Sequence, residues 1–314
     1  MIGLATASAI LLLVSLIGIS SNLVALLTVK RTKYMHNTFG ALCVSLASCN
    51  LGICLIYFGW CSVATLSMVD SKDHLFFDSE VGKKVGQVAL LFLYGSIYTH
   101  LAVSFNRMMS LMYPLRYLLM FDMRKSAALL CVVWTCAFIE IVPYFWSREC
   151  YFFYKYEVAL WEFAETECGE FFGFYFDFLP SIVVVGCILV MDVVALMKLR
   201  ASHKDAHVST MSQEQQKARK IEIGFFIQSL CQTVPFLMAV LCFHVVSRYA
   251  ETDWQLFWAM TFSWVSLHTI DGFIIDIFHT RRSVFKLPKK LKIVPSFSVS
   301  TESRGDDTKS AETR

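Results

Sequence analysis

The sequence predicts an all-α membrane protein: a bundle of seven transmembrane helices with its N-terminus outside and its C-terminus inside. Hydrophobic residues make up 56% of the chain and the mean hydropathy is +0.55, whereas soluble domains are usually about 45–50% apolar. Seven apolar stretches are each long enough to cross a bilayer, which takes about 20 residues. In lipid such a stretch must satisfy its backbone hydrogen bonds internally, and therefore as a helix.

The predicted spans leave little of the chain outside the bundle. They are residues 2–29, 38–68, 85–112, 126–147, 171–198, 221–247 and 254–278. The first has no basic residue before it and Lys30 and Arg31 after it. This order is the reverse of a secretory signal peptide, so we expect the segment to remain as a spanning helix. We assign residues 1–285 to the seven-helix domain and residues 286–314 to a cytoplasmic tail, basic at first and then disordered.

The basic residues predict the orientation. With the N-terminus outside, 22 of the 28 lysines and arginines fall on the cytoplasmic side and 6 on the outer side. Loops rich in lysine and arginine stay on the cytoplasmic side of a membrane. The distribution therefore favours an outer N-terminus and an inner C-terminus.

The longest outer segment, residues 148–170, is rich in aromatic and acidic side chains. Cys150 and Cys168 lie there in an oxidising compartment, and we expect them to form a disulfide; the alternative is two free thiols. Closed in this way, the segment could form a hairpin lid over the mouth of the bundle. The other nine cysteines lie in or beside the spans, none at metal-binding spacing. The sequence predicts no metal site, no cofactor and no nucleic-acid partner.

Polar residues inside the spans are costly in lipid and are therefore candidates for function. Asn22 in the first span and Asn50 in the second are amides at mid-membrane depth. One interpretation is that each forms a hydrogen bond to a neighbouring helix. The other, compatible with the first, is that both belong to one polar network that repacks during a conformational change.

A polar and basic block follows the third span. It contains Asn106 and Arg107, then a Y-P-L-R-Y segment with Pro114 and Tyr117. This block resembles the D-R-Y end of the third helix, and the P-L-x-Y segment after it, in rhodopsin-like G-protein-coupled receptors. Other positions of that pattern follow in the same order along the chain: Gly18 and Asn22 in span 1, Asn50 in span 2, Trp134 in span 4, Pro180 in span 5, Pro235 in span 6 and Asp271 in span 7.

Departures from that pattern narrow the resemblance. They are N-R in place of D-R, Gly82 where the third helix usually has a cysteine, F-F-x-Q from Phe225 in span 6, and H-T-I-D-G from His268 in span 7. Together they are similar to the nematode serpentine receptor class X family. The resemblance implies a chemosensory receptor in the plasma membrane of a sensory-neuron cilium, in which the Cys150–Cys168 pair replaces the usual disulfide.

The resemblance also implies roles for the cytoplasmic half. Arg107 would hold the resting state and then meet the G-protein C-terminal helix when span 6 swings out. Asn106 lacks the charge of the usual acid, so Glu214 and Glu222 are the candidate ionic partners of Arg107. Pro235 is expected to break span 6 and act as its pivot, the alternative being a static kink.

The middle and outer halves carry two further implied sites. Asn50 and Asp271 would form the interior switch, where Asn50 in place of the usual acid weakens a sodium site. The ligand would lie between spans 3, 5, 6 and 7, and the candidate lining is Ala89, Leu93, Tyr94, Asp177, Phe236 and His244.

Three observations on the sequence bear on the class of ligand. Ala89 stands where amine receptors carry a carboxylate, which argues against that class. Span 7 has no lysine, so a retinal Schiff base is excluded. Glu140 and Asp177 could each bind a cationic ligand group or pair with a neighbouring hydroxyl.

The sequence therefore predicts a G-protein-coupled chemosensory receptor that binds an external small molecule and activates a heterotrimeric G protein. A peptide ligand stays open because the outer loops are acidic, and a multi-span transporter is the weaker alternative. We expect no enzyme activity, since the histidines form no H-E-x-x-H motif. The expected surroundings are the lipid bilayer and, on the serine- and threonine-rich tail, an arrestin after phosphorylation; a plain solubilising tail is the alternative.

Overall fold

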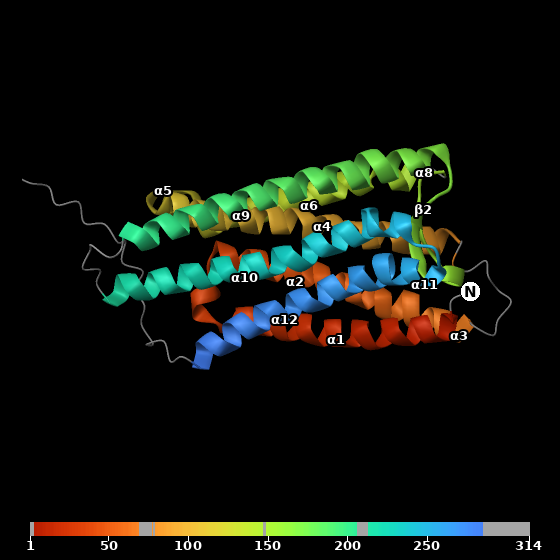
Figure 1. The fold of residues 1–314 in the computed structure, drawn as a ribbon, viewed down its shortest axis with the longest axis horizontal. Coiled ribbons are helices and arrows are strands. Elements are labelled where there is room, and N and C mark those ends of the chain that lie inside the picture. The colour runs from red at the N-terminus through yellow and green to blue at the C-terminus, as the bar shows by residue number, and fades with distance from the viewer. Residues whose placement is uncertain (1–2, 69–76, 78, 147–148, 206–212, 285–314) are drawn as a thin grey trace, which may run out of the picture.

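The computed structural model describes residues 3–68, 77, 79–146, 149–205 and 213–284. Figure 1 shows long helices side by side along one axis, with the β-hairpin, α8 and α11 gathered at one end and α5 at the other. The predicted tail 286–314, with the serines and threonines expected to be phosphorylated, lies outside the described residues.

All seven predicted spans are helical, and four of them contain short extra segments. They are α1 (Leu4–Arg31); α2 (Thr38–Ile56) with the π-helical η2 (Tyr57–Ala64) and α3 (Thr65–Met68); α4 (Glu80–Met112); α6 (Met123–Ile141) with α7 (Pro143–Trp146); α8 (Glu167–Phe172), the π-helical η5 (Gly173–Phe178) and α9 (Leu179–Asp205); α10 (Gln213–His244); and α11 (Asp253–Leu256), the π-helical η7 (Phe257–Phe262) and α12 (Ser263–Val284).

The connections contain the remaining elements. They are η1 (Lys33–Met35), α5 (Pro114–Met120), β1 (Phe152–Lys155), η4 (Tyr156–Val158), β2 (Leu160–Phe163) and η6 (Val246–Tyr249). Pro114 is the first residue of α5, a position where the missing proline N–H costs no hydrogen bond.

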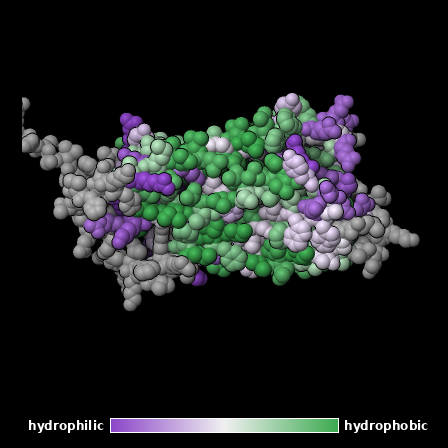
Figure 2. Space-filling model, in the orientation of Figure 1, coloured by the Kyte–Doolittle hydropathy of each residue, from purple (hydrophilic) through white to green (hydrophobic). Residues whose placement is uncertain are grey.

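Five of the spans are long and apolar enough by composition to cross a membrane. The other two are built on α6 and α12. Their apolar parts are interrupted or bordered by charged residues: Arg124, Lys125 and Glu140 in α6, and Asp271 and Asp276 in α12. The space-filling view shows a broad apolar belt between polar ends (Figure 2). Leu13 in α1 and Val190 and Met197 in α9 are each more than 60% exposed, as side chains that face lipid would be.

Short polar side chains set where several helices begin. The Asn37 side chain accepts a hydrogen bond from the backbone N–H of Gly40 at the start of α2, and Asp122 does the same for Lys125 at the start of α6. Such caps satisfy N–H groups that have no partner within the helix. Hydropathy marks only the part of a helix inside lipid, which explains why α4 and α10 begin before their predicted spans.

The outer segment forms the predicted hairpin. Strands β1 and β2 pair antiparallel with Phe152 opposite Phe163, and Cys150 and Cys168 are joined by a disulfide. Alternation along the strand turns Phe152 and Tyr154 inward, where both are buried. Lys155 faces outward, where the Glu162 carboxylate, 2.8 Å from its ammonium, raises the pKa of that lysine.

The helix around Pro235 differs from the prediction. The expected break in span 6 is absent, because α10 continues through Pro235 to His244. Proline removes one backbone donor but leaves the rest of the helix free to form. The Thr233 hydroxyl adds a hydrogen bond to the Ser229 carbonyl at 3.2 Å beside this point.

The hairpin packs so closely against α4 that position 86 of that helix has no room for a side chain larger than that of glycine. A methyl group placed on Gly86 would lie 1.8 Å from the carbonyl oxygen of Phe152 in β1. We expect Gly86→Ala to push the hairpin outward and destabilise the receptor fold by about 1–3 kcal/mol, the usual cost of overpacking. The melting temperature of the purified protein in lipid nanodiscs measures this loss.

Gly186 in α9 provides the matched control, since a methyl group there would meet nothing within 4 Å. Gly186→Ala should be neutral or slightly stabilising, because alanine is the better helix former. Equal melting temperatures for the two variants would contradict the close packing of β1 on α4.

Candidate functional site

A cavity lies beneath the hairpin, enclosed by α4, η5, α9, α10 and α12. It contains about 510 Å³ of empty space, its open mouth included. Its lining comprises Leu90, Leu93, Ile97, Phe152, Asp177, Ser181, Phe236, Ala239, Val240, Phe243, His244, Trp264 and Leu267. The walls are therefore mostly aromatic and aliphatic, as in pockets that hold small organic molecules.

Of the six residues proposed to line the ligand site, four line this cavity: Leu93, Asp177, Phe236 and His244. Ala89 and Tyr94 are buried but do not line the cavity. Leu90, Leu93 and Ile97 follow the i, i+3, i+7 spacing of one helix face. Ala89 and Tyr94 lie on either side of that face, where they pack into the surrounding core.

Asp177 is the acidic group of the cavity. It lies in the π-helical segment η5 and is only 4% exposed. Its Oδ1 accepts a hydrogen bond from the Tyr94 hydroxyl at 3.3 Å, and its Oδ2 lies 3.9 Å from Nε2 of His244. The other acid considered, Glu140, accepts a hydrogen bond from the Tyr98 hydroxyl at 2.7 Å and does not line the cavity.

Below the cavity a polar network joins three helices. Oδ2 of Asp271 in α12 accepts from Nδ2 of Asn50 in α2 at 3.4 Å and lies 3.2 Å from Nε2 of His100 in α4. Oδ1 of Asn50 lies 2.7 Å from Nδ1 of His268. All four side chains are buried. Asn50 and Asp271 thus lie together, as expected, with two histidines that the switch hypothesis did not include.

The contacts of His268 fix the form of its ring. Its Nε2 accepts a hydrogen bond from the Trp264 indole at 2.9 Å, so Nδ1 must carry the proton and donate to Asn50. The backbone carbonyl of His268 accepts from Nδ2 of Asn22 at 2.9 Å, which ties α1 to the same point. In the described part of the chain, no three His, Cys, Asp or Glu side chains are grouped to hold a metal ion.

Two aromatic residues connect the cavity with this network. Trp264 lines the cavity and donates to His268, while Phe236 lines the cavity and stacks on the His100 ring with centroids 4.9 Å apart. A molecule in the cavity would therefore touch rings whose other side contacts the network. Repacking of either ring would shift His268 or His100 and so change the hydrogen bonds of the network around Asp271.

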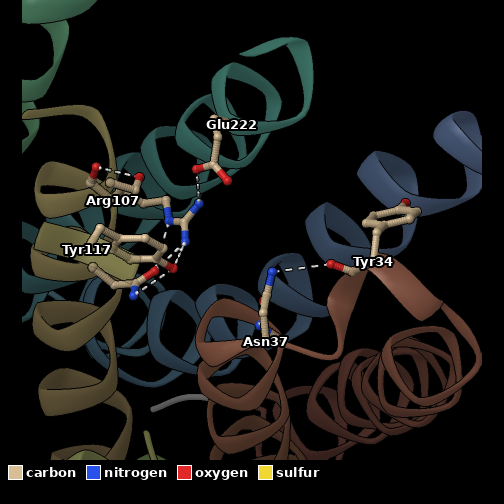
Figure 3. Close-up of polar contacts among 8 residues, drawn as sticks. Tyr34, Asn37, Arg107, Tyr117 and Glu222 are labelled. Atoms are coloured by element: carbon tan, nitrogen blue, oxygen red, sulfur yellow. Dashed lines mark hydrogen bonds and ion pairs between the residues drawn. The ribbon is translucent and has the colours of Figure 1, made fainter. Parts of the chain in front are cut away.

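At the end of the bundle far from the hairpin, Arg107 contacts partners from three helices (Figure 3). Its Nη1 lies 3.0 Å from Oε2 of Glu222 in α10, and its Nε donates to Oδ1 of Asn106 at 3.1 Å. Nη2 donates to the same Asn106 oxygen and, at 3.5 Å, to the Tyr117 hydroxyl of α5. Glu222 thus supplies the charge that Asn106 lacks; the Glu214 side chain lies outside the described residues.

Two phenylalanines complete the enclosure of Arg107. Its guanidinium carbon lies 4.2 Å from the ring centroid of Phe39 in α2 and 5.2 Å from that of Phe225 in α10. We call Phe39 and Phe225 the aromatic clamp. Arg107 is 1% exposed, and a desolvated cation against aromatic faces gains about 2 kcal/mol or more.

Sequence reasoning missed Phe39, His100 and Trp264. Phe225 begins the F-F-x-Q motif noted in span 6, but that motif did not predict its contact with Arg107. A signal existed for His100, which lies seven residues before Arg107 and so on nearly the same helix face. Phe39 and Trp264 resemble any other aromatic residue of an apolar span.

Residues 12–279 match the family model described as the serpentine type 7TM GPCR chemoreceptor Srx. The chain belongs to this receptor family. Two members from Caenorhabditis elegans are similar to it: serpentine receptor class X 45 is 22% identical over 306 residues, covering 90% of this chain and 81% of that protein. Serpentine receptor class X-43 is 26% identical over 213 residues, covering 64% and 63%.

The fold of this Srx receptor is shared beyond the family. Squid rhodopsin superposes with a TM-score of 0.70 at 14% identity, covering 90% of this chain and 83% of that one. At 14% sequence identity, what the two proteins share is the seven-helix architecture. Family and fold are those of G-protein-coupled receptors, which are not enzymes.

The polar network should be sensitive to loss of Asn50. Asn50→Leu leaves Nδ1–H of His268 without its acceptor and removes a donor to Asp271. A buried group deprived of its partner costs about 1–3 kcal/mol, so we expect the melting temperature in nanodiscs to fall by several degrees.

Ser48→Ala is the matched control two residues away in α2. The Ser48 hydroxyl is on the exposed side of the helix and bonds the Val44 carbonyl of its own helix at 2.8 Å. A melting temperature near that of the intact protein is expected. If Asn50→Leu were equally harmless, the network would not stabilise the bundle.

Proposed function

We propose that this Srx receptor binds a small molecule from outside the cell in the cavity beneath the hairpin and activates a heterotrimeric G protein at the Arg107 end. The two sites are separated along one continuous helix, α4. From Leu93 to Arg107 is 14 residues, or about 21 Å of α-helix. A signal must therefore cross the bundle, and the polar network lies between the two sites.

The arrangement of Arg107 is the observation that carries this proposal. Its guanidinium is fully enclosed, and two of its partners, Glu222 and Phe225, belong to α10. Arg107 can therefore become available to a cytoplasmic partner only if α10 moves away. This is the arrangement expected of a receptor at rest, with Asn106, Tyr117 and Pro114 shaping the surface beside Arg107.

The route from ligand to α10 begins with the two rings that line the cavity. Phe236 follows Pro235 directly, at the point where α10 lacks one backbone hydrogen bond. A ligand that displaces Phe236 would act on the helix at that point. It shifts the equilibrium only by its preference for the displaced packing over the resting one.

The remaining parts of the proposal concern the orientation of the protein in the membrane, its location in the cell and its C-terminal tail. The charge distribution supports an outer N-terminus, with the disulfide-closed hairpin on the outer side and the basic tail inside. Family membership supports a plasma-membrane protein and, by its chemosensory class, the cilium of a sensory neuron. The domain division at residue 285 and an arrestin on the phosphorylated tail are proposals of the same kind.

A small molecule fits better than a peptide. The hairpin covers the cavity with buried Phe152 and Trp161, whose rings stack with centroids 5.3 Å apart. A peptide would need this cover to open widely. If the acidic outer surface nevertheless bound a basic peptide, activation by peptides alone in a mixed ligand panel would reveal it.

The direct test is ligand-dependent nucleotide exchange on purified Gα proteins, using membranes that contain the intact receptor or Arg107→Ala. A panel of small odorants and secreted metabolites supplies the ligands. We expect at least one compound to accelerate exchange with the intact receptor and none to do so with Arg107→Ala at equal surface abundance. Responses of equal size from both proteins would contradict the role given to Arg107.

The aromatic clamp predicts a ligand-free effect. Phe225→Ala removes one face of the clamp and should raise basal nucleotide exchange, up to about tenfold if about 1.4 kcal/mol of resting-state preference is lost. Ile227→Ala is the control on the same helix, since Ile227 is 42% exposed on the lipid side. An unchanged basal rate in Phe225→Ala, with the protein folded, would show that the clamp does not hold the resting state.

A further inference from the structure

We propose that the cavity recognises a small amine, whose ammonium group pairs with Asp177 while its apolar body lies among the aromatic walls. This inference rests on the proposed function and specifies the ligand class of the same site. It follows from the one strongly polar feature of an otherwise apolar space.

The lining offers few groups to a polar ligand. Among the described lining residues, the polar side chains besides the Trp264 indole are those of Asp177, Ser181 and His244. The indole N–H is already donated to His268. A ligand must therefore find its polar partner at Asp177 and its neighbours, on the side of the cavity formed by η5, α9 and the outer end of α10.

The carboxylate of Asp177 is short of partners. Within the described residues it accepts one side-chain hydrogen bond, from Tyr94 at 3.3 Å, and Nε2 of His244 at 3.9 Å is beyond hydrogen-bond distance from Oδ2. Within the described residues, Asp177 forms no ion pair with a lysine or arginine. Arg248 lies over the ring of Phe178, outside the cavity lining. A carboxylate that is 4% exposed requires a cation or several donors to remain charged.

An ammonium group supplies what is missing. It brings one positive charge and up to three N–H donors to Oδ2, and charge-assisted hydrogen bonds are about twice as strong as neutral ones. The rings of Phe236, Phe243 and Trp264 line the same space and attract cations by their faces. A neutral alcohol would bring a donor without the charge, and a carboxylate ligand would meet Asp177 with like charge.

The position of the acid also resolves an apparent conflict in the sequence. Ala89 lacks the carboxylate that amine receptors carry in the third helix. Here α4 presents Leu90 and Leu93 to the cavity, and the carboxylate comes from η5, close enough to α4 for Tyr94 to reach it. The π-helical turn of η5 directs Asp177 inward, toward Tyr94 of α4.

The test uses the full-length receptor in lipid nanodiscs and three matched probes: isoamylamine, isoamyl alcohol and isovalerate, with benzylamine, benzyl alcohol and benzoate as a second series. Ligand-induced change in melting temperature measures binding without a G protein. We expect an amine to raise the melting temperature more than its matched alcohol, and the carboxylates to have no effect. An alcohol or carboxylate that outperforms the amine in both series, or no binding by either amine, would overturn the proposal.

Substitutions locate the contact. Asp177→Asn should weaken amine binding by about tenfold or more, the effect of losing one charged partner, while leaving binding of the alcohol unchanged or improved. Ser181→Ala, on the same wall, should preserve the preference for amines. Unchanged amine affinity in Asp177→Asn would overturn the assignment; if that variant does not fold, Asp177→Glu, which keeps the charge, must retain the preference for amines over alcohols.

The outcome is separable from that of the proposed function. Basal exchange in Phe225→Ala tests coupling to Gα with no ligand present. A receptor that couples in this way and binds alcohols rather than amines would refute only the ligand class. Amine binding without any exchange on Gα would instead refute the signalling proposal.

Discussion

The buried carboxylate of Asp271 is the group around which the bundle is organised. An unpaired carboxylate inside a lipid-embedded bundle is among the costliest groups a protein can hold, and Asp271 is 0% exposed. Asn50 and His100 converge on its Oδ2 from α2 and α4. Three helices must therefore keep their relative positions for Oδ2 to keep both partners, while the buried Oδ1 has no hydrogen-bond partner among the described residues. Asn22 brings α1 to the same place through the backbone of His268.

This constraint explains how two distant sites can share one equilibrium. On the hairpin side of the network, Trp264 and Phe236 touch both the cavity and a histidine of the network. On the other side, α4 continues from His100 to Arg107 in two helical turns, and Arg107 is held by the aromatic clamp and Glu222. A few-kcal/mol preference at each point is enough to keep one packing dominant, and binding at either end can shift it.

The sequence predicted the parts of this structure that depend on local chemistry. Seven apolar runs mark seven helices because a backbone in lipid must form its hydrogen bonds internally. The disulfide was predictable because Cys150 and Cys168 are close in sequence and are the two cysteines of the loop between spans 4 and 5. Glu214 and Glu222 were named as candidate ionic partners of Arg107 because both lie near the base of span 6, and Glu222 forms the ion pair. The contact of Phe39 with Arg107 was not predictable, because it depends on the rotation of α2 about its axis. The same applies to Ala89 and Tyr94, because their positions around the axis of α4 lie less than a quarter turn from the face that lines the cavity.

The most direct test of this account is the distance between α5 and α10 at the Arg107 end of the bundle, measured by pulsed electron paramagnetic resonance. Spin labels on a ketone-bearing amino acid at exposed Met120 and Lys220 leave the native cysteines in place. The account predicts that Phe225→Ala, which opens the aromatic clamp, adds a population with a longer distance than in the intact receptor. Raised nucleotide exchange with an unchanged distance distribution would contradict the claim that Arg107 is released by movement of α10.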